Sequence, residues 1–497
     1  MADAKREIER KYESDDGGLP DLTGVGPVAA VLDKGLVELD AVYYDTADER
    51  LAAANLTLRR RTGGSDAGWH LKLPLAPGVR EEIRAPLSDT VPDEIAALVR
   101  SRVRDAELIP LVHLRSARDV RHLVDADGTL LAEASVDTVT AERLTGGRGA
   151  AQWTEIEVEL ADDGDPAFLD QVEKRLRKAG VRPSTSPSKL AHALEQTAGT
   201  RRKPPGPAQP VTAGDHVLAY LRAQRDAVVD LDPAVRRDTP DAVHRMRVAT
   251  RRARSTLRTF RTVLDRAATD PVGAELKWLA GELGVDRDQE VLAERLTTAL
   301  DALPPDLVSG PVRERLASWA GTRHRRAHAH LTGVLDSRRY LTLLDTLDTL
   351  LADPPLRKAA ARKPDKVLSR AVHKDLAKLT ALVEHALNAP PGEQRDLAVH
   401  EARKKAKRTR YAAEAATPAL GARARALTAS MKSLTTLLGD HQDSVMARRT
   451  LRELAATAHA AGESAFTYGV LYGKEEARAA AAEAELPGLW RRIAAGR

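Results

Sequence analysis

Apolar and polar residues alternate strictly over residues 153–160, which read Trp-Thr-Glu-Ile-Glu-Val-Glu-Leu. This period of two, with β-branched residues between the charges, predicts a strand with one apolar and one polar face. Because side chains two positions apart point the same way, Glu155, Glu157 and Glu159 share the polar face. Like charges at that spacing repel. The face is therefore either fully solvated or holds a hard cation that accepts oxygen ligands, such as Mg²⁺ or Mn²⁺.

The chain begins with the same kind of alternation. Residues 7–11 read Glu-Ile-Glu-Arg-Lys, which places Glu7, Glu9 and Lys11 on one face of a predicted first strand. If the sheet closes into a barrel, its first and last strands bring five carboxylates and an ammonium group into one interior cavity. Such a cavity could bind a metal ion and phosphate together.

Between these two strands the chain shows short alternating runs, separated by clusters of Gly, Pro and Asp. That pattern is typical of β-strands joined by turns. The strands that we expect lie at residues 5–12, 36–45, 55–62, 68–75, 80–87, 117–124, 129–143 and 152–160. Eight such strands suit a closed antiparallel β-barrel.

Three helices are expected to flank the barrel. Residues 93–102 carry a modest apolar stripe, and residues 165–179 form a clear amphipathic pattern that begins at an Asp-Pro pair. Ser188 and Lys189 begin a last short helix.

A Pro-rich break follows. Residues 199–211 contain Lys-Pro-Pro-Gly-Pro and resemble a semi-rigid, extended spacer. We therefore expect a first domain over residues 1–198, a linker over 199–211 and a second domain over 212–497.

The second domain is predicted to be helical throughout. Ala, Leu and Arg dominate its composition, and apolar residues recur at intervals of three and four. It also contains an internal repeat. Residues 243–254 match residues 399–410 without a gap, and residues 276–288 match residues 431–443 one residue out of step. Two copies of one supersecondary unit are therefore expected.

Each copy of the repeat carries a basic helix face. Positions on these faces are His244, Arg247, Arg251, Arg254 and Arg258 in the first copy, and His400, Arg403, Lys407 and Arg410 in the second. Acidic partners at three or four residues are almost absent. A solvated basic face is the simpler interpretation, but uncompensated positive charge destabilises a helix unless an anion is bound. The pattern favours an anion site.

Charge is divided unevenly between the two domains. Residues 1–200 hold 26 Lys and Arg against 36 Asp and Glu, a net charge of −10, whereas the remainder holds 51 against 36, a net charge of +15. An acidic half joined to a basic half indicates that the second half meets a polyanion.

The composition limits the remaining function classes. There is no cysteine, which excludes disulfides and thiolate metal sites and fits a reducing compartment. No apolar run reaches the roughly 18 residues of a membrane span, and the first residues are charged rather than signal-like. We therefore expect a soluble, cytoplasmic protein that has no membrane partner.

Eight motifs of the first domain resemble, in order, those of the CYTH superfamily, the triphosphate tunnel metalloenzymes. They are Glu7-x-Glu9-x-Lys11, Tyr43-Tyr44-Asp45-Thr46, Leu58-Arg59-Arg60-Arg61, Leu71-Lys72, Arg80-Glu81-Glu82-Ile83-Arg84, Arg115-x-x-Arg118, Glu155-x-Glu157-x-Glu159 and Ser188-Lys189. The resemblance covers residues 1 to about 198. It implies an eight-stranded antiparallel barrel forming a tunnel, and hydrolysis or cyclisation of triphosphorylated substrates with Mg²⁺ or Mn²⁺.

The same resemblance assigns roles to residues. Metal binding and orientation of the attacking water would belong to Glu7, Glu9, Glu155, Glu157 and Glu159, with Glu7, Glu9 and Lys11 as the catalytic set. Phosphate oxygens would be held by Lys11, Arg59, Arg61, Lys72, Arg84, Arg118 and Lys189. These residue types suit the task, because guanidinium forks clamp phosphates and a metal ion neutralises charge during in-line transfer. His70 stands where a small hydroxyl residue is expected, which leaves the substrate preference open.

The repeated basic helices resemble the CHAD domain, an α-helical domain of two related four-helix bundles around a basic pore that binds inorganic polyphosphate. The resemblance covers about residues 212–497. It implies polyphosphate binding by His244, Arg247, Arg251, Arg254, Arg258, Lys277, His400, Arg403, Lys404, Lys407, Arg410 and Lys432. A CYTH domain followed by a CHAD domain is a known arrangement with inorganic triphosphatase activity.

The leading hypothesis is therefore metal-dependent hydrolysis of tripolyphosphate in the barrel, with long-chain polyphosphate bound by the helical domain. A nucleic acid is a less favoured partner, since single strands are usually held by aromatic stacking and aromatics are scarce here. A non-catalytic polyphosphate-binding protein remains an alternative. So do a triphosphatase acting on nucleoside or thiamine triphosphate and a nucleotide cyclase. The oligomeric state stays open.

Overall fold

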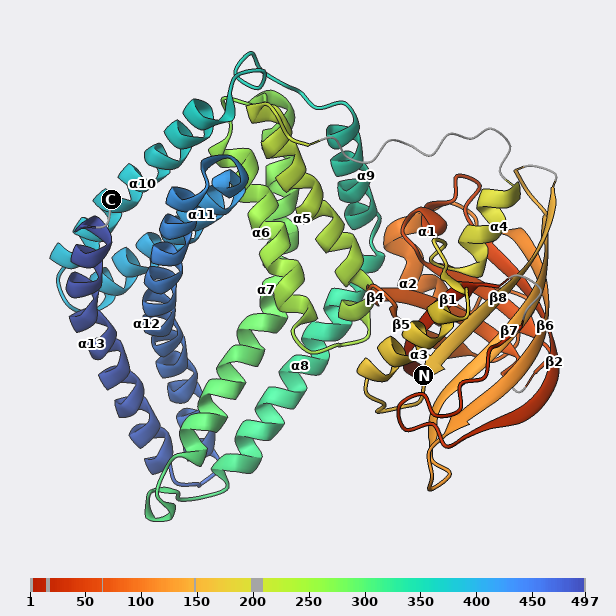
Figure 1. Ribbon diagram of the computed structural model, residues 1–497. Coiled ribbons are helices and arrows are strands. Elements are labelled where there is room, and N and C mark those ends of the chain that lie inside the picture. The colour runs from red at the N-terminus through yellow and green to blue at the C-terminus, as the bar shows by residue number, and fades with distance from the viewer. Residues whose placement is uncertain (1–2, 15–17, 65, 147–148, 198–208, 496–497) are drawn as a thin grey trace. The chain divides into compact units, whose positions relative to one another are not determined.

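The computed structural model describes residues 3–14, 18–64, 66–146, 149–197 and 209–495, in two compact units, Met1–Pro205 and Gly206–Arg497. The first unit is built from strands and the second from helices (Figure 1). Of the expected linker, residues 199–208 lie outside the described part of the chain.

The first unit is a closed barrel of eight antiparallel strands, as the alternation predicts. The strands are β1 (Asp3–Glu13), β2 (Ala30–Asp45), β3 (Thr57–Thr62), β4 (Gly68–Ala76), β5 (Val79–Ala85), β6 (Ile109–Val124), β7 (Leu130–Arg143) and β8 (Ala150–Leu160). They pair in the order β5-β4-β3-β2-β6-β7-β8-β1, and β5 pairs with β1 to close the barrel. A two-residue strand, β9 (Arg182–Pro183), pairs with the end of β1.

Two strands are longer than the sequence pattern predicts. β2 and β6 pair with each other from Ala30 and Val124 to Asp45 and Ile109, with a register shift at Gly35. This irregularity interrupts the period of two in β2, which is why the alternation marks only the second part of that strand.

The apolar cores of this unit lie outside the barrel, beneath its helices. The helices are α1 (Arg50–Ala53), α2 (Asp93–Val103), α3 (Ala167–Lys178) and α4 (Lys189–Thr197). Ile156 and Val158 of β8 pack against Phe168 and Leu176 of α3, α2 packs on β3 to β5, and α4 packs on β2, β6 and β7. Because alternate side chains point to opposite faces, the charged residues of these strands are left to fill the interior.

The second unit consists of antiparallel helices, drawn in green to blue in Figure 1. They are α5 (Ala213–Arg236), α6 (Ala242–Thr259), α7 (Arg266–Asp301), α8 (Val312–Asp336), α9 (Arg338–Ala352), α10 (Pro364–Asn388), α11 (Glu393–Leu420), α12 (Ala422–Ala460) and α13 (Phe466–Ala495), with a 3₁₀ turn, η1, at Pro305–Leu307.

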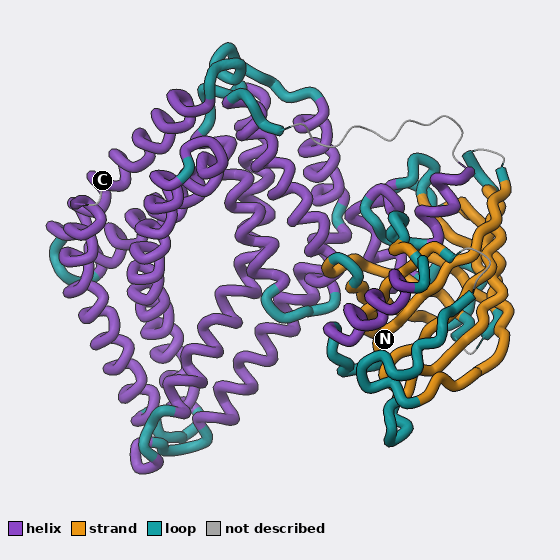
Figure 2. The backbone as a smooth tube through the Cα atoms, viewed as in Figure 1, coloured by secondary structure: helices purple, strands orange, loops and turns teal. Residues whose placement is uncertain are grey.

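The two copies of the repeat form two four-helix sets. The first set is α5 to α8 and the second is α10 to α13. In the sequence α9 lies between the two sets, and in space it packs on α5, α7 and α8. Within each set, neighbours in sequence pack side by side, and α6 of the first set also contacts α11 of the second (Figure 2). In the first copy Met246, Ala253, Leu257 and Phe260 are buried in the largest apolar core of the described residues.

Although several of these helices are long, the described residues include no helix with a stretch apolar enough to cross a membrane.

Candidate functional site

The interior of the barrel is a polar cavity of about 590 Å³. Its wall is formed mainly by charged side chains from β1, β3, β4, β5, β6 and β8 and from the start of α4. In the described part of the chain, Tyr43 is the only aromatic side chain that lines it.

The first and last strands meet inside this cavity. Lys11 lies opposite Glu157 in the β1–β8 register, and Glu9 lies opposite Glu159. The Lys11 ammonium contacts the Glu157 carboxylate and lies 3.4 Å from Glu9. Burial by itself raises the pKa of Glu157, but the positive charges of Lys11, Lys189 and Arg118 outweigh it and hold that pKa well below its ordinary value.

Three carboxylates gather beside the start of α4, where Glu157 lines the cavity and Asp137 and Glu155 lie behind its wall. Oxygen atoms of Asp137, Glu155 and Glu157 lie within 4.8 Å of one another. The Lys189 Nζ lies 3.0 Å from Asp137, 2.9 Å from Glu155 and 2.6 Å from Glu157. Arg118 donates to both oxygens of Asp137 at 2.7 and 2.8 Å and to Glu157 at 2.6 Å. Carboxylate oxygens are the ligands that Mg²⁺ and Mn²⁺ prefer, so this group fits a hard divalent cation.

Lys189 reaches this group because it is the first residue of α4. The Ser188 hydroxyl accepts a hydrogen bond from the Ala191 amide at 3.1 Å, which caps the helix and fixes the residue that follows it. Burial by itself lowers the pKa of Lys189. The negative charges of Asp137, Glu155 and Glu157 outweigh that effect and raise the pKa well above its ordinary value.

A second charged group lies on the wall formed by β3 to β5, around Glu82. This buried carboxylate accepts from Arg84 at 2.5 Å and from Arg59 at 3.4 Å, and Lys72 lies 3.7 Å away. Lys72 also donates to Glu7 at 2.5 Å. Burial raises the pKa of Glu82, but its hydrogen bond to His70 and the neighbouring cations lower it far below its ordinary value.

His70 supports this group from behind the wall. Its Nδ1 lies 3.0 Å from Glu82, and its Nε2 lies 2.8 Å from the Asp66 carbonyl oxygen. Burial lowers the pKa of His70 to about 4. The residue at this position therefore orients a carboxylate of the cavity rather than facing the cavity itself.

The cations of the cavity are crowded together. Burial and the charges of Arg59 and Arg118 lower the pKa of Arg61 to about 9. The Asp66 carboxylate contacts the Arg61 guanidinium on one side. Because a guanidinium stays protonated in proteins, this pKa shift marks a position whose charge a bound anion would stabilise.

Most of the site residues expected from the sequence line this one cavity. These are Glu7, Glu9, Lys11, Arg59, Arg61, Lys72, Arg84, Arg118, Glu157, Glu159 and Lys189. Glu155 lies just behind the wall, where it accepts a hydrogen bond from the Trp153 indole at 2.6 Å and pairs with Lys189. The five carboxylates expected to bind metal are not brought to one point. Glu155 and Glu157 lie together, whereas Glu159 pairs with Lys5 at 3.0 Å.

Two carboxylates of the site were not assigned a role from the sequence. Asp137 lies opposite Glu155 and Arg118 in the pairings of β7, and Glu82 lies opposite Lys72 in the β4–β5 pairing. Both occupy alternating polar positions of their strands, which is the signal that could have identified them.

In the helical unit, α6 with α7 and α11 with α12 form the same arrangement of an arginine, an aspartate and a glycine at equivalent positions of the repeat. Arg247 donates to Asp288 at 2.7 Å, and its repeat counterpart Arg403 lies 3.6 Å from Asp443. Each arginine passes over a glycine of the partner helix. A Cβ at Gly284 would lie 2.8 Å from the Arg247 guanidinium, and a Cβ at Gly439 would lie 3.4 Å from the Arg403 guanidinium.

Lys407 lies among these arginines. Burial and the charges of Arg403, Arg251 and Arg247 lower its pKa to about 7. Burial also lowers the pKa of Arg251, and the charges of Arg247 and Arg403 act in the same direction. Cations from α6 and α11 therefore converge on one region where their charges repel.

The positive charges of the basic helices are nevertheless partly paired, because acidic partners come from other helices and, for Arg410, from the same helix. Asp375 of α10 lies 2.5 Å from Lys405 and 3.1 Å from Arg408. Glu414 of α11 lies 2.9 Å from Arg252 and 3.3 Å from Arg410. The expectation that positive charge goes uncompensated therefore holds only for part of the face.

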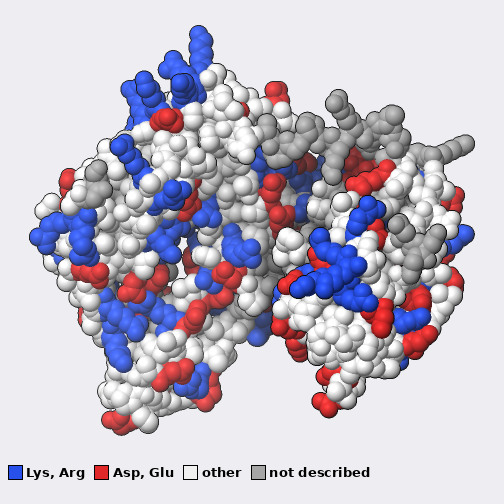
Figure 3. Space-filling model, viewed as in Figure 1, with Lys and Arg blue, Asp and Glu red and all other residues white. Residues whose placement is uncertain are grey.

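The other expected polyphosphate-binding residues lie in different surroundings. Burial lowers the pKa of His244 and of His400, and the His400 Nδ1 lies 2.7 Å from the Gln442 side-chain oxygen. Arg254 is half-buried, whereas the side chains exposed to solvent are those of Arg258, Lys277, Lys404 and Lys432. Lys and Arg side chains form several patches on the visible face of the helical unit, with Asp and Glu between them (Figure 3).

Comparison with known protein families finds two matches along the chain. The model of the CYTH domain matches residues 5–193, and the model of the CHAD domain matches residues 219–452. Two uncharacterized proteins of Mycobacterium tuberculosis, from strains CDC 1551 / Oshkosh and ATCC 25618 / H37Rv, are each 40% identical over 485 residues. The alignments cover 94% of this chain and 92% of each relative.

Solved structures are similar to part of the chain. PptA from Streptomyces chartreusis is 25% identical with a TM-score of 0.48, over 57% of this chain and 100% of that one. The CHAD domain from the plant Ricinus communis is 24% identical with a TM-score of 0.46, over 59% of this chain and 97% of that one.

Proposed function

The chain belongs to the family in which a CYTH domain is followed by a CHAD domain, and from this membership we propose that its barrel hydrolyses inorganic triphosphate with a divalent metal ion. The observation that carries the proposal is the barrel cavity, where crowded cations lie beside a group of carboxylates. A polyanion that carries a metal ion would match this arrangement, because its phosphates suit the cations and its metal ion suits the carboxylates.

The cationic half suits the phosphate groups. Arg59, Arg61 and Arg84 offer guanidinium forks that match phosphate oxygens, and Lys11 and Lys72 offer point charges. In the free protein these groups pair with carboxylates of the cavity. A bound triphosphate would draw them to its own oxygens and release the carboxylates.

The acidic half suits a metal ion. Mg²⁺ or Mn²⁺, held by Glu155 and Glu157 with the adjoining Asp137, would neutralise phosphate charge and polarise the anhydride bond. Glu7, Glu9 and Glu159 line the same cavity.

Hydrolysis requires a group that accepts a proton from water. The water oxygen bonds to the terminal phosphorus, the bridging P–O bond breaks, and the products are diphosphate and phosphate. Glu7 suits the role of proton acceptor because burial, together with the charges of Glu82 and Glu159, raises its pKa above the ordinary value against the opposing charge of Lys72.

The lining also favours inorganic triphosphate over a nucleotide. A nucleobase usually stacks on aromatic side chains, and Tyr43 is the only aromatic among the described residues that line the cavity. Nothing in that lining offers a second ring to sandwich a base.

Phosphate release from a substrate panel tests this proposal. We expect tripolyphosphate to show a higher kcat/KM than ATP or thiamine triphosphate with Mg²⁺ or Mn²⁺, and no turnover in chelator. A higher kcat/KM for ATP, or full turnover in chelator, would contradict the substrate or the metal role, respectively.

For the helical unit we propose binding of long-chain polyphosphate. Its support is the convergence of Arg247, Arg251, Arg403 and Lys407, whose charges repel one another in the free protein. Phosphate groups spaced along a flexible chain can neutralise several such cations at once, with release of counterions.

A further inference from the structure

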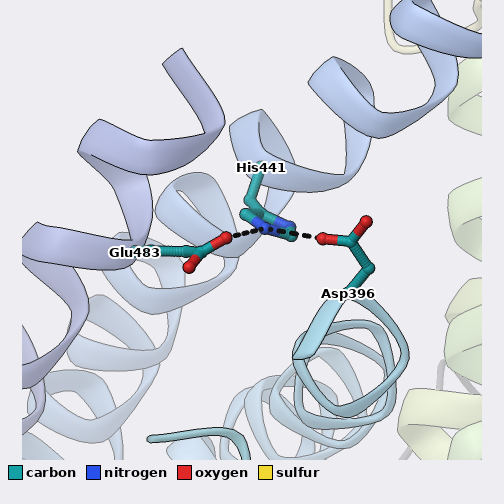
Figure 4. A group of neighbouring side chains, drawn as sticks. All are labelled: Asp396, His441 and Glu483. Carbon is teal, nitrogen blue, oxygen red and sulfur yellow. Dashed lines mark hydrogen bonds and ion pairs between the residues drawn. The ribbon is translucent and has the colours of Figure 1, made fainter. Parts of the chain in front are cut away.

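A buried histidine of the second helical copy lies between two carboxylates from other helices. His441 belongs to α12 and is 2% exposed. Its Nε2 lies 3.1 Å from Glu483 Oε1 of α13 and 3.3 Å from Asp396 Oδ1 of α11 (Figure 4). The three side chains therefore converge on one point from three helices.

The two carboxylates are held in this orientation by arginines. Glu483 uses its other oxygen, Oε2, to accept from Arg395 at 3.0 Å, and Asp396 uses Oδ2 to accept from Arg448 at 3.5 Å. Each carboxylate therefore turns one oxygen to an arginine and the other to His441. Carboxylates that bind metal ions are commonly oriented by such outer hydrogen bonds.

The separations match those of ligands on one metal ion. Ligands about 2.0–2.1 Å from a tetrahedral Zn²⁺ lie about 3.3 Å apart. The two separations from Nε2 are 3.1 and 3.3 Å, and all three ligand atoms lie within 4.8 Å of one another. A single N–H at Nε2 cannot point at both oxygens, whereas an ion at their centre can bond to all three atoms.

The ring is free to take the tautomer that a metal requires. Metal binding through Nε2 needs the proton on Nδ1. Among the described residues the buried Nδ1 has no hydrogen-bond partner, so no donor opposes a proton there. Among those residues, the ring makes its polar contacts at Nε2.

The cluster is particular to the second copy of the repeat. In the sequence alignment of the copies, Pro240 and Asp286 stand where the second copy has Asp396 and His441. The cluster is thus not a by-product of the duplicated basic face. It nevertheless adjoins that face, because Gln442 pairs with His400 at 2.7 Å.

We propose that Asp396, His441 and Glu483 form a binding site for a borderline divalent cation of the Zn²⁺ type, which would join α11, α12 and α13. One imidazole nitrogen and two carboxylate oxygens suit Zn²⁺, Co²⁺ or Mn²⁺ better than Mg²⁺ or Ca²⁺, which prefer oxygen alone. Three protein ligands leave a fourth tetrahedral position for water or for an anionic ligand. The site is independent of the activity proposed for the barrel.

The test is Zn²⁺ binding to the full chain without a histidine tag, measured by equilibrium dialysis and by X-ray absorption. We expect a bound Zn²⁺ with a nitrogen ligand, a raised Tm in Zn²⁺, and Zn²⁺ affinity at least about tenfold lower in His441→Gln. The control is His330→Gln. His330 lies 2.7 Å from the Glu282 carboxylate in the first copy and outside the cluster, so that variant should bind Zn²⁺ like the wild type.

The barrel carboxylates can bind metal as well, which is why the nitrogen ligand is the decisive signal. If His441→Gln does not fold, as judged by circular dichroism, Glu483→Gln replaces it, with the same expected loss. The proposal is overturned if the nitrogen ligand is missing in the wild type, if it persists in folded His441→Gln, or if folded Glu483→Gln binds Zn²⁺ with wild-type affinity. It is equally overturned if Zn²⁺ leaves the Tm unchanged, since the cluster is then a hydrogen-bonded contact alone.

Discussion

At the scale of single residues, the cations around Lys407 make the free energy of unfolding depend on pH in a specific way. Its pKa of about 7 lies below the ordinary value of 10.5 because of burial and the charges of Arg403, Arg251 and Arg247. In the folded protein without ligand this group therefore binds fewer protons than in the unfolded chain between about pH 7 and pH 10.5. Its contribution to the free energy of unfolding rises with pH across that window.

Polyphosphate binding should reverse this shift, because phosphate favours the charged ammonium. We expect uptake of about half a proton at pH 7 and nearly one at pH 8.5, and an affinity that falls as pH rises through this range. Titration calorimetry in buffers of different ionisation enthalpy measures the uptake. Lys407→Arg should bind without proton uptake. Identical apparent enthalpies in every buffer for the wild type would contradict the prediction.

Glu157 offers a second prediction at this scale. Glu157→Gln removes the proposed metal ligand that also lines the cavity, so we expect triphosphate hydrolysis to fall by about 100-fold or more. Lys11 and Lys189 keep other acidic neighbours, Glu9 and Asp137, so the fold should persist. Phosphate release and circular dichroism measure the two effects.

A matched control for that variant is Glu173→Gln. Glu173 pairs with Arg10 at 2.8 Å outside the cavity. The Glu173→Gln variant should therefore hydrolyse triphosphate at the wild-type rate. Comparable losses in both variants would show that general destabilisation, and not the cavity, is the cause.

At the scale of elements, the path of the Arg247 side chain from α6 over α7 depends on one glycine. In Gly284→Ala the new Cβ would lie 2.8 Å from the Arg247 guanidinium and displace it. Alanine also favours a helix by roughly 0.5–1 kcal/mol over glycine. We therefore expect polyphosphate affinity to fall about tenfold, the cost of one charge-assisted contact, without loss of thermal stability.

Gly281→Ala on the same helix is the control, because a Cβ at Gly281 meets no atom within 4 Å. It should gain the same helix propensity and keep wild-type affinity. Affinity and Tm of both variants are measured together. Equal affinities in the two variants would mean that Arg247 does not contact polyphosphate.

At the scale of the whole molecule, the two proposed functions should be separable, since each unit has its own apolar cores. Replacement of Arg247, Arg251, Arg403 and Lys407 by Ala should weaken polyphosphate binding. The slope of the logarithm of the affinity against the logarithm of the salt concentration should become shallower by about 0.7 for each phosphate contact removed. Triphosphate hydrolysis should remain unchanged in the same full-length variant.

The matching experiment uses Glu157→Gln, which should bind polyphosphate with wild-type affinity. Single-stranded DNA should compete poorly in both proteins, because stacking partners are scarce. A loss of hydrolysis in the fourfold variant, or of polyphosphate binding in Glu157→Gln, would show that the units depend on each other.

The sequence by itself determined the type and order of most elements, because the periods of two and of 3.6 are local properties. Alternation over residues 153–160 fixes which face of β8 is charged, and its apolar face then packs on α3. The repeat likewise predicts two sets of helices, since residues 243–254 and 399–410 share one pattern. For the same reason most of the cavity residues could be named from motifs.

Only the tertiary structure decided which side chains meet. Asp137 joins Glu155 and Lys189 through the register of β7 with β8 and the start of α4, and no local pattern encodes a register between distant strands. In the same way, the acids that pair with α11 come partly from α10, and His441 meets Asp396 and Glu483 from two other helices. Charge pairing depends on distance in space, and residues far apart in the chain come close only after the cores have packed.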